Sequence, residues 1–142
     1  MKKFVRILAL SLVSVMLLAT LASCGAPAKD PADAKAALEE ADYIVLIDDK
    51  LTPAAFKVAG YDLSSVLTAT KISKDDEGKT VVDHVSVYYF VDKDAATKAM
   101  DKVKEEFKDD KKEESEDSVW VEPKQSGAMI YYGTKAAIKA AK

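Results

Sequence analysis

The stretch TVVDHVSVYYFV, residues 80–91, reads as a long strand and decides the fold of this chain. β-Branched and aromatic side chains dominate it, as they do in strands. A second run of this kind, SSVLTATKI at 64–72, precedes it, and the polar cluster KDDEGK at 74–79 lies between the two. Two such runs joined by a cluster of turn residues predict an antiparallel hairpin.

The two faces of the 80–91 strand differ in polarity. Successive side chains of a strand point to opposite faces, so odd and even positions separate. The odd positions are mostly aliphatic and predict a core face, whereas the even positions are mixed. We therefore expect one covered face and one partly open face. The odd set is Val81, Asp83, Val85, Val87, Tyr89 and Val91, and the even set is Val82, His84, Ser86, Tyr88 and Phe90.

Helices and further strands are predicted on both sides of the hairpin. The strongest helix is the amphipathic segment 92–107, and the charge run that follows it, 108–117, is expected to be a solvated loop. Together the elements predict an α+β fold with a mostly antiparallel sheet of about five strands and helices packed on one face. The other expected helices are 31–41, 53–59 and one after Thr134, and the other expected strands are 43–47, 118–122 and 128–132.

The first residues have the organisation of a secretory signal. Lys2, Lys3 and Arg6 precede the uncharged run Ile7 to Ala22. A basic start, an apolar middle and small residues before a cut are typical of such signals. The alternative is a transmembrane anchor, which needs about 20 apolar residues. The run is shorter and includes Ser and Thr, so we prefer the signal.

The sequence Leu21-Ala22-Ser23-Cys24 resembles the lipobox of bacterial lipoproteins. The resemblance covers only residues 1–24 and implies that the Cys24 thiol receives diacylglycerol and becomes the first mature residue. It divides the chain into a signal at 1–23, a tether at 24–30 and one domain at 31–142. The implied location is the extracytoplasmic side of the cell membrane, held by lipid, since two acyl chains anchor stably. The alternative is an unmodified cysteine after an ordinary signal.

Charge and composition argue against several partners. The whole chain has a net charge of −3, and residues 1–23 carry three basic and no acidic side chains, which leaves −6 on the remainder. An acidic domain repels phosphate backbones, so no nucleic acid partner is expected. The expected partners are the membrane, through the lipid, and a protein or cell-envelope ligand.

No motif predicts a cofactor or a metal. The chain has one histidine and one cysteine, too few for an ordinary zinc site, and its five glycines are too dispersed to cradle a phosphate. A Ser–His–acid triad would have to use His84, for which a surface role is expected instead. A hydrolase can use two carboxylates that are distant in sequence and that only folding brings together, and such a pair leaves no motif. The alternative function is therefore a small cell-envelope hydrolase with dispersed carboxylates.

The candidate ligand-binding residues are aromatic. If neighbouring strands align them, Tyr88, Phe90, Trp120 and Tyr131 form a stripe on the open face of the sheet. Exposed aromatic side chains suit recognition because they offer large, rigid contact area. The alternative is that helices cover this face and that the stripe is core. The preferred function is a small binding or interaction module held near the membrane.

Overall fold

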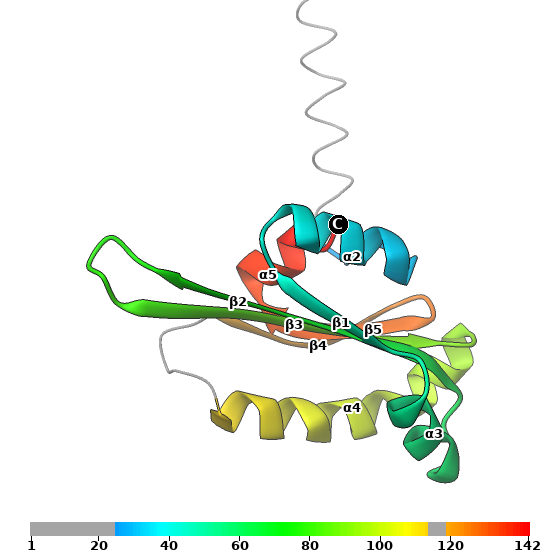
Figure 1. Ribbon diagram of the computed structural model, residues 1–142. Coiled ribbons are helices and arrows are strands. Elements are labelled where there is room, and N and C mark those ends of the chain that lie inside the picture. Colours follow the sequence, from blue (N-terminus) through cyan, green and yellow to red (C-terminus); the bar gives the residue numbers. More distant parts are fainter. Residues whose placement is uncertain (1–24, 114–118) are drawn as a thin grey trace, which may run out of the picture.

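The computed structural model describes residues 25–113 and 119–142 and has an α+β fold (Figure 1). Five strands form a single antiparallel sheet in the order β1-β2-β3-β5-β4, so the predicted class and sheet are confirmed. The elements in chain order are α2 (Pro31–Glu40), β1 (Ile44–Asp48), α3 (Leu51–Val58), β2 (Leu63–Lys74), β3 (Thr80–Phe90), α4 (Lys93–Glu113), β4 (Trp120–Ser126), β5 (Met129–Thr134) and α5 (Lys135–Ala140).

The β2–β3 hairpin is the long axis of the molecule, as the sequence predicts. Its register pairs Thr70 with His84 and Lys74 with Thr80. The turn is closed by Asp75, whose carboxylate accepts hydrogen bonds from the backbone N–H groups of Glu77 and Lys79 at 3.0 and 2.8 Å. A short polar side chain that satisfies local backbone donors is a common way to fix a turn.

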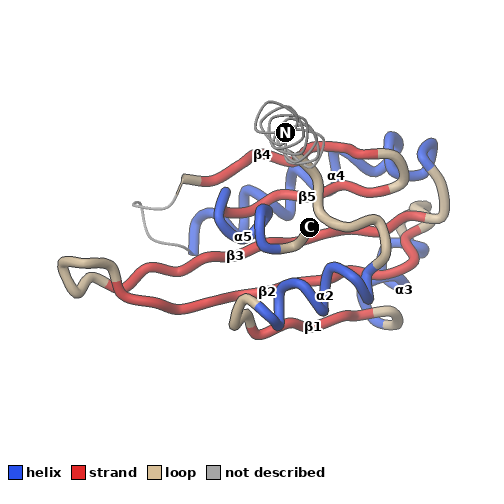
Figure 2. The backbone as a smooth tube through the Cα atoms, turned by 90° about the horizontal axis from the view of Figure 1, so that it is seen from above, coloured by secondary structure: helices blue, strands red, loops and turns tan. Residues whose placement is uncertain are grey.

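Helices cover both faces of the sheet, not one face as expected. Helices α2 and α5 lie on one side of the sheet, and α3 and α4 lie on the other (Figure 1). Figure 2 shows the same sheet from above, with β1 and β4 at its two edges. The second layer follows from β3 itself, because both its odd and its even side chains are buried from Val85 to Phe90.

Each face therefore has its own core. Under α2 and α5 the core includes Leu38, Val87 and Ile138, and under α3 and α4 it includes Phe56 and Val103. The polarity of β3 changes along its length rather than between its faces: positions 81–84 are only partly buried, and the residues beyond them are fully packed. The face of the even positions, expected to be partly open, is covered over Tyr88 and Phe90 and is only partly buried at Val82 and His84.

The start of the described chain is docked, although residues 24–30 are expected to be a tether. The N–H of Ala28 donates to the carbonyl of Ala141 at 2.8 Å, and the hydroxyl of Tyr89 donates to the carbonyl of Ala28 at 3.0 Å. Pro27, which precedes Ala28, is buried. Residues 26–28 thus lie against the core beneath α2 and α5, beside the carboxyl end of the chain.

In the last third of the chain, the ends of α4 and β4 differ from those predicted. Helix α4 continues to Glu113, so the first part of the expected loop 108–117 is helical, and its residues 114–117 lie outside the described residues. The helix begins where the Asp92 carboxylate accepts the N–H of Ala95 at 2.7 Å. Strand β4 extends to Ser126 through Pro123, with a register shift between Val121 and Lys124. Proline is tolerated there because β4 is an edge strand.

Candidate functional site

The four aromatic residues predicted as a binding stripe do not form one. Tyr88 and Phe90 are 6% and 5% exposed beneath α3 and α4, and Tyr131 is equally buried on the opposite face, beneath α2 and α5. The register explains the separation, since Tyr88 pairs with Ile130 and Tyr131 pairs with Val87. Trp120 alone is partly exposed, and it packs beside Phe107. For Tyr88 and Phe90 the alternative prediction is therefore the right one: helices cover these side chains, and they belong to the core.

A polar network surrounds His84 where the sheet meets α4. Its Nδ1 atom lies 3.1 Å from the Thr70 hydroxyl, and its Nε2 atom lies 2.9 Å from the Ser86 hydroxyl and 3.9 Å from a carboxylate oxygen of Asp110. The Trp120 ring packs on the imidazole with centroids 5.9 Å apart. His84, for which the sequence predicts a half-exposed surface role, is partly exposed but more buried than that, with 15% of its side chain exposed, and it links β3 to α4.

This network lacks the geometry of a Ser–His–acid triad. In such a triad the serine and the acid contact opposite nitrogens of the imidazole ring. Here Ser86 and Asp110 both approach Nε2, and Ser86 is only 1% exposed, so a substrate cannot reach its hydroxyl. Burial lowers the pKa of His84 and outweighs the opposite effect of Asp110. The neutral imidazole is thus a structural hydrogen-bonding group.

Two tyrosines extend the network under α4. The Tyr132 hydroxyl donates to the Asp110 carboxylate, and the Tyr88 hydroxyl lies 3.4 Å from that of Tyr132. Burial raises the pKa of Tyr88 to about 12 and also raises the pKa of Tyr132. Both phenols stay protonated at neutral pH, so they serve to hold α4 on the sheet.

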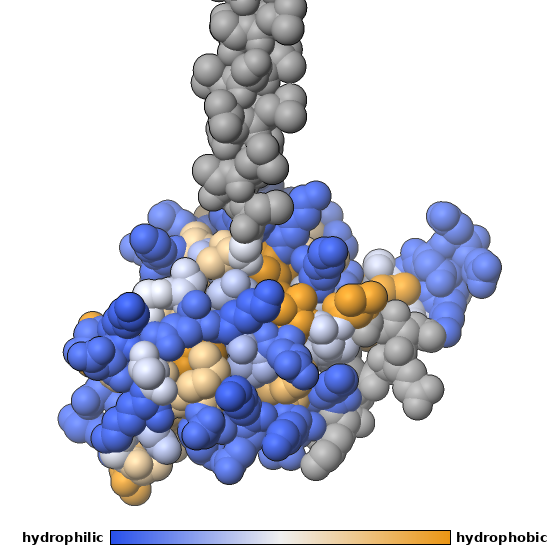
Figure 3. All heavy atoms as spheres, turned by 180° about the vertical axis from the view of Figure 1, so that it is seen from behind, coloured by the Kyte–Doolittle hydropathy of each residue, from blue (hydrophilic) through white to orange (hydrophobic). Residues whose placement is uncertain are grey.

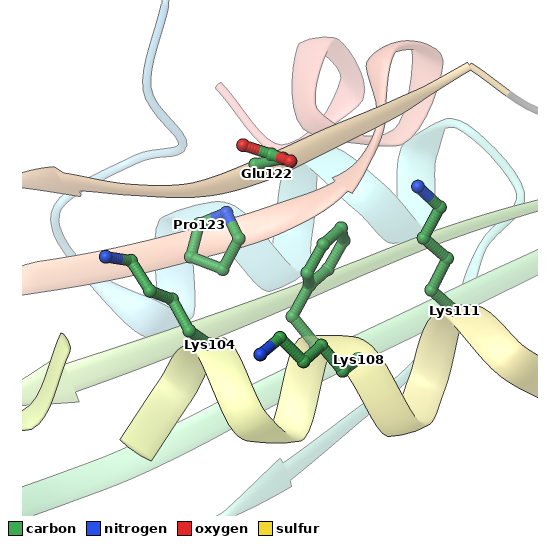
Figure 4. A pocket seen from close by; sticks show the side chains of 6 residues that line it. Lys104, Lys108, Lys111, Glu122 and Pro123 are labelled. Carbon is green, nitrogen blue, oxygen red and sulfur yellow. The ribbon is translucent and has the colours of Figure 1, made fainter. Parts of the chain in front are cut away.

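A groove between α4 and the edge strand β4 is the more accessible feature (Figure 4). Its volume is about 590 Å³. Lysines project from α4 along one side, and Glu122 and Pro123 come from β4 on the other. We call it the α4–β4 groove, and its described lining is Lys104, Phe107, Lys108, Lys111, Glu122 and Pro123.

The α4–β4 groove combines an apolar floor with a cationic rim. Phe107 is 7% exposed and packs in the core against Trp120 and, edge to face, against Tyr132, with ring centroids 6.2 and 5.3 Å away. The ammonium of Lys111 lies 5.7 Å from the centre of the Phe107 ring. Seen from behind, onto the β4 edge, hydrophilic side chains surround smaller areas of apolar surface (Figure 3). An amphiphile with a negative group matches such a site.

Lysines dominate the flank of α4 that faces β4, although one acid lies beside them, since Asp101 is 3.7 Å from the Lys104 ammonium. Lys104, Lys108 and Lys111 follow one another at spacings of four and three residues, which places them on one side of a helix. Glu106 and Asp110 occupy the other flank, toward β3, where Glu106 pairs with Lys102 at 2.9 Å and Asp110 contacts Tyr132. The lysine flank therefore faces β4 with Glu122 as the only acid in the described lining.

The lysine rim is not predicted by the sequence pattern. The charge run 108–117 predicts a solvated loop, which separates Lys108 and Lys111 from the helix that carries Lys104. The recurrence of lysine at 104, 108 and 111, with acids at 106 and 110, is the signal that could have revealed a two-sided helix. Pro123, expected in the loop between the last two strands, gave no signal of its own.

The predicted lipid site lies outside the described residues. The structure describes the chain from Gly25 onward, so Cys24 and the lipobox-like residues before it are not seen. None of the helices in the described ranges is both long and apolar enough to cross a membrane. Within the same ranges, no three His, Cys, Asp or Glu side chains gather in a way that could hold a metal ion.

Comparison with known proteins adds no relative: no family model, curated protein or solved structure matches this chain.

Proposed function

We propose that this chain is a bacterial lipoprotein, anchored through Cys24 on the extracytoplasmic side of the cell membrane, whose domain is a small binding module. The lipobox-like residues 21–24 support the anchor. The observation that carries the binding role is the α4–β4 groove, with its apolar floor and its row of three lysines. The proposed ligand is an envelope molecule with an apolar body and a negatively charged group.

The chemistry of the groove places such a ligand in one orientation. Apolar atoms of the ligand would cover Phe107 and Pro123, where contact with water is unfavourable. Its anionic group would lie toward α4, because Lys104, Lys108 and Lys111 attract it and Glu122 on β4 repels it. Pairing near an apolar floor strengthens this attraction, since water screens it less.

The alternative function, a small hydrolase with dispersed carboxylates, has weaker support. Glycoside hydrolysis of the ordinary kind needs two carboxyl groups that flank the scissile bond. The described lining of the α4–β4 groove has a single acid, Glu122, and its other charged residues are lysines. These residues suit retention of an anion better than acid–base catalysis.

A matched pair of dyes tests the binding role. Anilinonaphthalene sulfonate has an apolar body and one negative charge, and N-phenylnaphthylamine has almost the same body without the charge. We expect residues 25–142, produced as a soluble domain, to bind the sulfonate about tenfold more tightly, a difference of about 1.4 kcal/mol. Energy transfer from Trp120, the only tryptophan, reports binding near the groove.

Lysine variants complete the experiment. Lys104→Gln, Lys108→Gln and Lys111→Gln together should remove the preference for the sulfonate and leave binding of the neutral dye unchanged. The matched control replaces Lys29, Lys50 and Lys57, which are exposed elsewhere, by glutamine and changes the net charge equally. Equal loss in both triple variants would show a general charge effect and contradict the proposal.

A further inference from the structure

The sheet face that carries α3 and α4 is only partly covered. A helix is about 10 Å across and strands lie about 4.8 Å apart, so one helix covers about two strands. The opposite face has α2 and α5 side by side above its strands (Figure 2). On this face α4 packs on β3, β5 and β4, and the short α3 packs on one end of β1 and β2. Among the described helices, none covers the rest of β1 and β2.

Large aliphatic side chains stand on this uncovered area. Ile44 and Leu46 of β1 are 77% and 68% exposed, and Ile72 of β2 is 72% exposed. Alternate residues of β2 from Val66 to Ile72 share one face, and Val66 belongs to the core under α3 and α4, so Ile72 lies on that side. Ile44 and Leu46 lie on the same side, because they pair with Thr70 and Thr68 of that face. We call this surface the open face; it comprises Ile44, Leu46, Thr68, Thr70, Ile72 and Val82.

The two edges of the sheet are treated differently. Strand β4 contains Pro123, charged side chains and a register shift, which are the devices that protect an edge from other chains. Strand β1 is aliphatic from Ile44 to Ile47 and has no such device before Asp48. An exposed aliphatic area beside an unprotected edge marks an interaction surface.

Acidic groups border the open face. Asp48 pairs with Val66 and so lies on this face at the α3 end. Its carboxylate accepts hydrogen bonds from the Thr52 hydroxyl and from the backbone N–H groups of residues 50–52, which lower its pKa and keep it charged. On the α4 side lies Asp110, whose side chain is 42% exposed. The basic side chain on the same flank of α4, Lys102, is neutralised by its ion pair with Glu106.

From these features we propose that the open face is the docking site for an amphipathic helix of a partner protein, with basic residues on its flanks. The helix would lie beside α4, with its apolar stripe on Ile44, Leu46 and Ile72. Its basic residues would meet Asp48 and Asp110. A second copy of this chain is the poorer occupant, because residues 25–142 have a net charge of −6 and two open faces would bring like charges together. This proposal does not rest on the α4–β4 groove.

The probe is a helix-forming peptide of leucine, alanine and lysine, about 18 residues or about five turns long, with leucine on one stripe and lysine on both flanks. The chain is used with its native N-terminus, in nanodiscs of phosphatidylcholine. Hydrogen exchange of the β1 and β2 amides is followed by mass spectrometry. At a peptide concentration about ten times the Kd, we expect exchange at 44–48 and 68–72 to slow about tenfold.

Two variants, each of which adds one negative charge, distinguish docking of the peptide on the open face from general electrostatic attraction between the peptide and the acidic protein. Leu46→Asp should abolish the slowing, although it adds a negative charge that a basic peptide would otherwise favour. Val91→Asp, at another exposed aliphatic position, should keep it. A peptide with glutamate in place of lysine should give no slowing.

Three results would overturn the proposal. The first is slowing in Leu46→Asp equal to that in Val91→Asp, which would mean that charge alone attracts the peptide. The second is equal slowing by the glutamate peptide. The third is a dimer of the unliganded chain in sedimentation that Leu46→Asp dissociates, which would make a second copy the occupant. Loss of binding to the α4–β4 groove would leave this inference unaffected.

Discussion

At the scale of single residues, Gly133 of β5 lies against the backbone of β3 with no room for a side chain. Its backbone has φ of +149°, and a Cβ atom there would lie 2.2 Å from the His84 carbonyl oxygen. Gly133→Ala should lower the free energy of unfolding by at least about 3 kcal/mol, because the backbone of two strands would have to separate. Urea denaturation measures the loss.

Gly127 provides the matched control for this prediction. It also has a positive φ, +61°, but a Cβ atom there would meet nothing within 4 Å. Gly127→Ala should therefore cost only about 1–2 kcal/mol, the ordinary penalty for a left-handed backbone. Equal losses in the two variants would show that crowding at Gly133 is unimportant.

His84 should make stability depend on pH. Burial lowers its pKa in the folded chain, so the unfolded chain binds the proton more readily. The stabilisation by neutral His84 is complete above the ordinary histidine pKa of about 6.5 and is lost as the pH falls below it. Wild type should thus lose more stability than His84→Gln between about pH 7 and pH 5 in urea denaturation. A smaller loss in wild type would mean that Asp110 dominates and raises the pKa.

At the scale of elements, the docked segment 26–28 depends on one side chain of β3. The Tyr89 hydroxyl donates to Ala28 at 3.0 Å. Tyr89→Phe should cost about 1 kcal/mol and speed hydrogen exchange at 26–29, because the phenyl ring keeps the packing and loses only the hydrogen bond. Hydrogen exchange mass spectrometry measures this. Unchanged exchange of the segment would show that packing of Pro27 alone holds it.

The elements themselves were largely predictable from sequence, because local patterns specify them. The hairpin follows from two β-rich runs around Gly78, and α2 follows from Asp30, whose carboxylate accepts the Ala32 N–H at 2.8 Å. The end of α4 was missed because a dense charge run is equally typical of a loop. Its lysines and acids alternate between two helix flanks, and that order is visible only once residues 108–113 are known to be helical.

The faces were less predictable, because they depend on register between strands that are distant in sequence. The strand pattern predicts Tyr131 on the face of Tyr88, but the β3–β5 register places Tyr132 there instead. A shift of one residue moves every side chain to the other face. The α4–β4 groove and the open face likewise arise from packing between elements, so neither could be predicted from any one segment.

At the scale of the whole molecule, the lipid anchor makes a clear prediction. Cys24→Ala should prevent both lipid attachment and removal of residues 1–23, because the thiol is the proposed acceptor. Mass spectrometry of the protein from its native host should show a diacylglyceryl mass on Cys24 in wild type. The variant should retain the complete N-terminus. An unmodified Cys24 in an uncut wild-type chain would contradict the proposed anchor.

The domain should fold without the anchor. Two packed cores and a complete antiparallel sheet lie within residues 25–142, which contain no cysteine. We expect this part of the chain to unfold in one cooperative transition, with the same midpoint in the presence and absence of a reductant. Circular dichroism during heating measures it. A gradual loss of signal would show that the N-terminal residues are needed for folding.

The central claim is that the α4–β4 groove is the ligand site of this module. The most direct measurement is an amide chemical-shift map of residues 25–142 titrated with anilinonaphthalene sulfonate. The account predicts that the largest shifts fall on both walls of the groove, at Phe107, Lys108 and Glu122. In the triple glutamine variant of Lys104, Lys108 and Lys111, about tenfold more dye should be needed to reach the same shifts. Shifts confined to Ile44, Leu46 and Ile72 of the open face would contradict it.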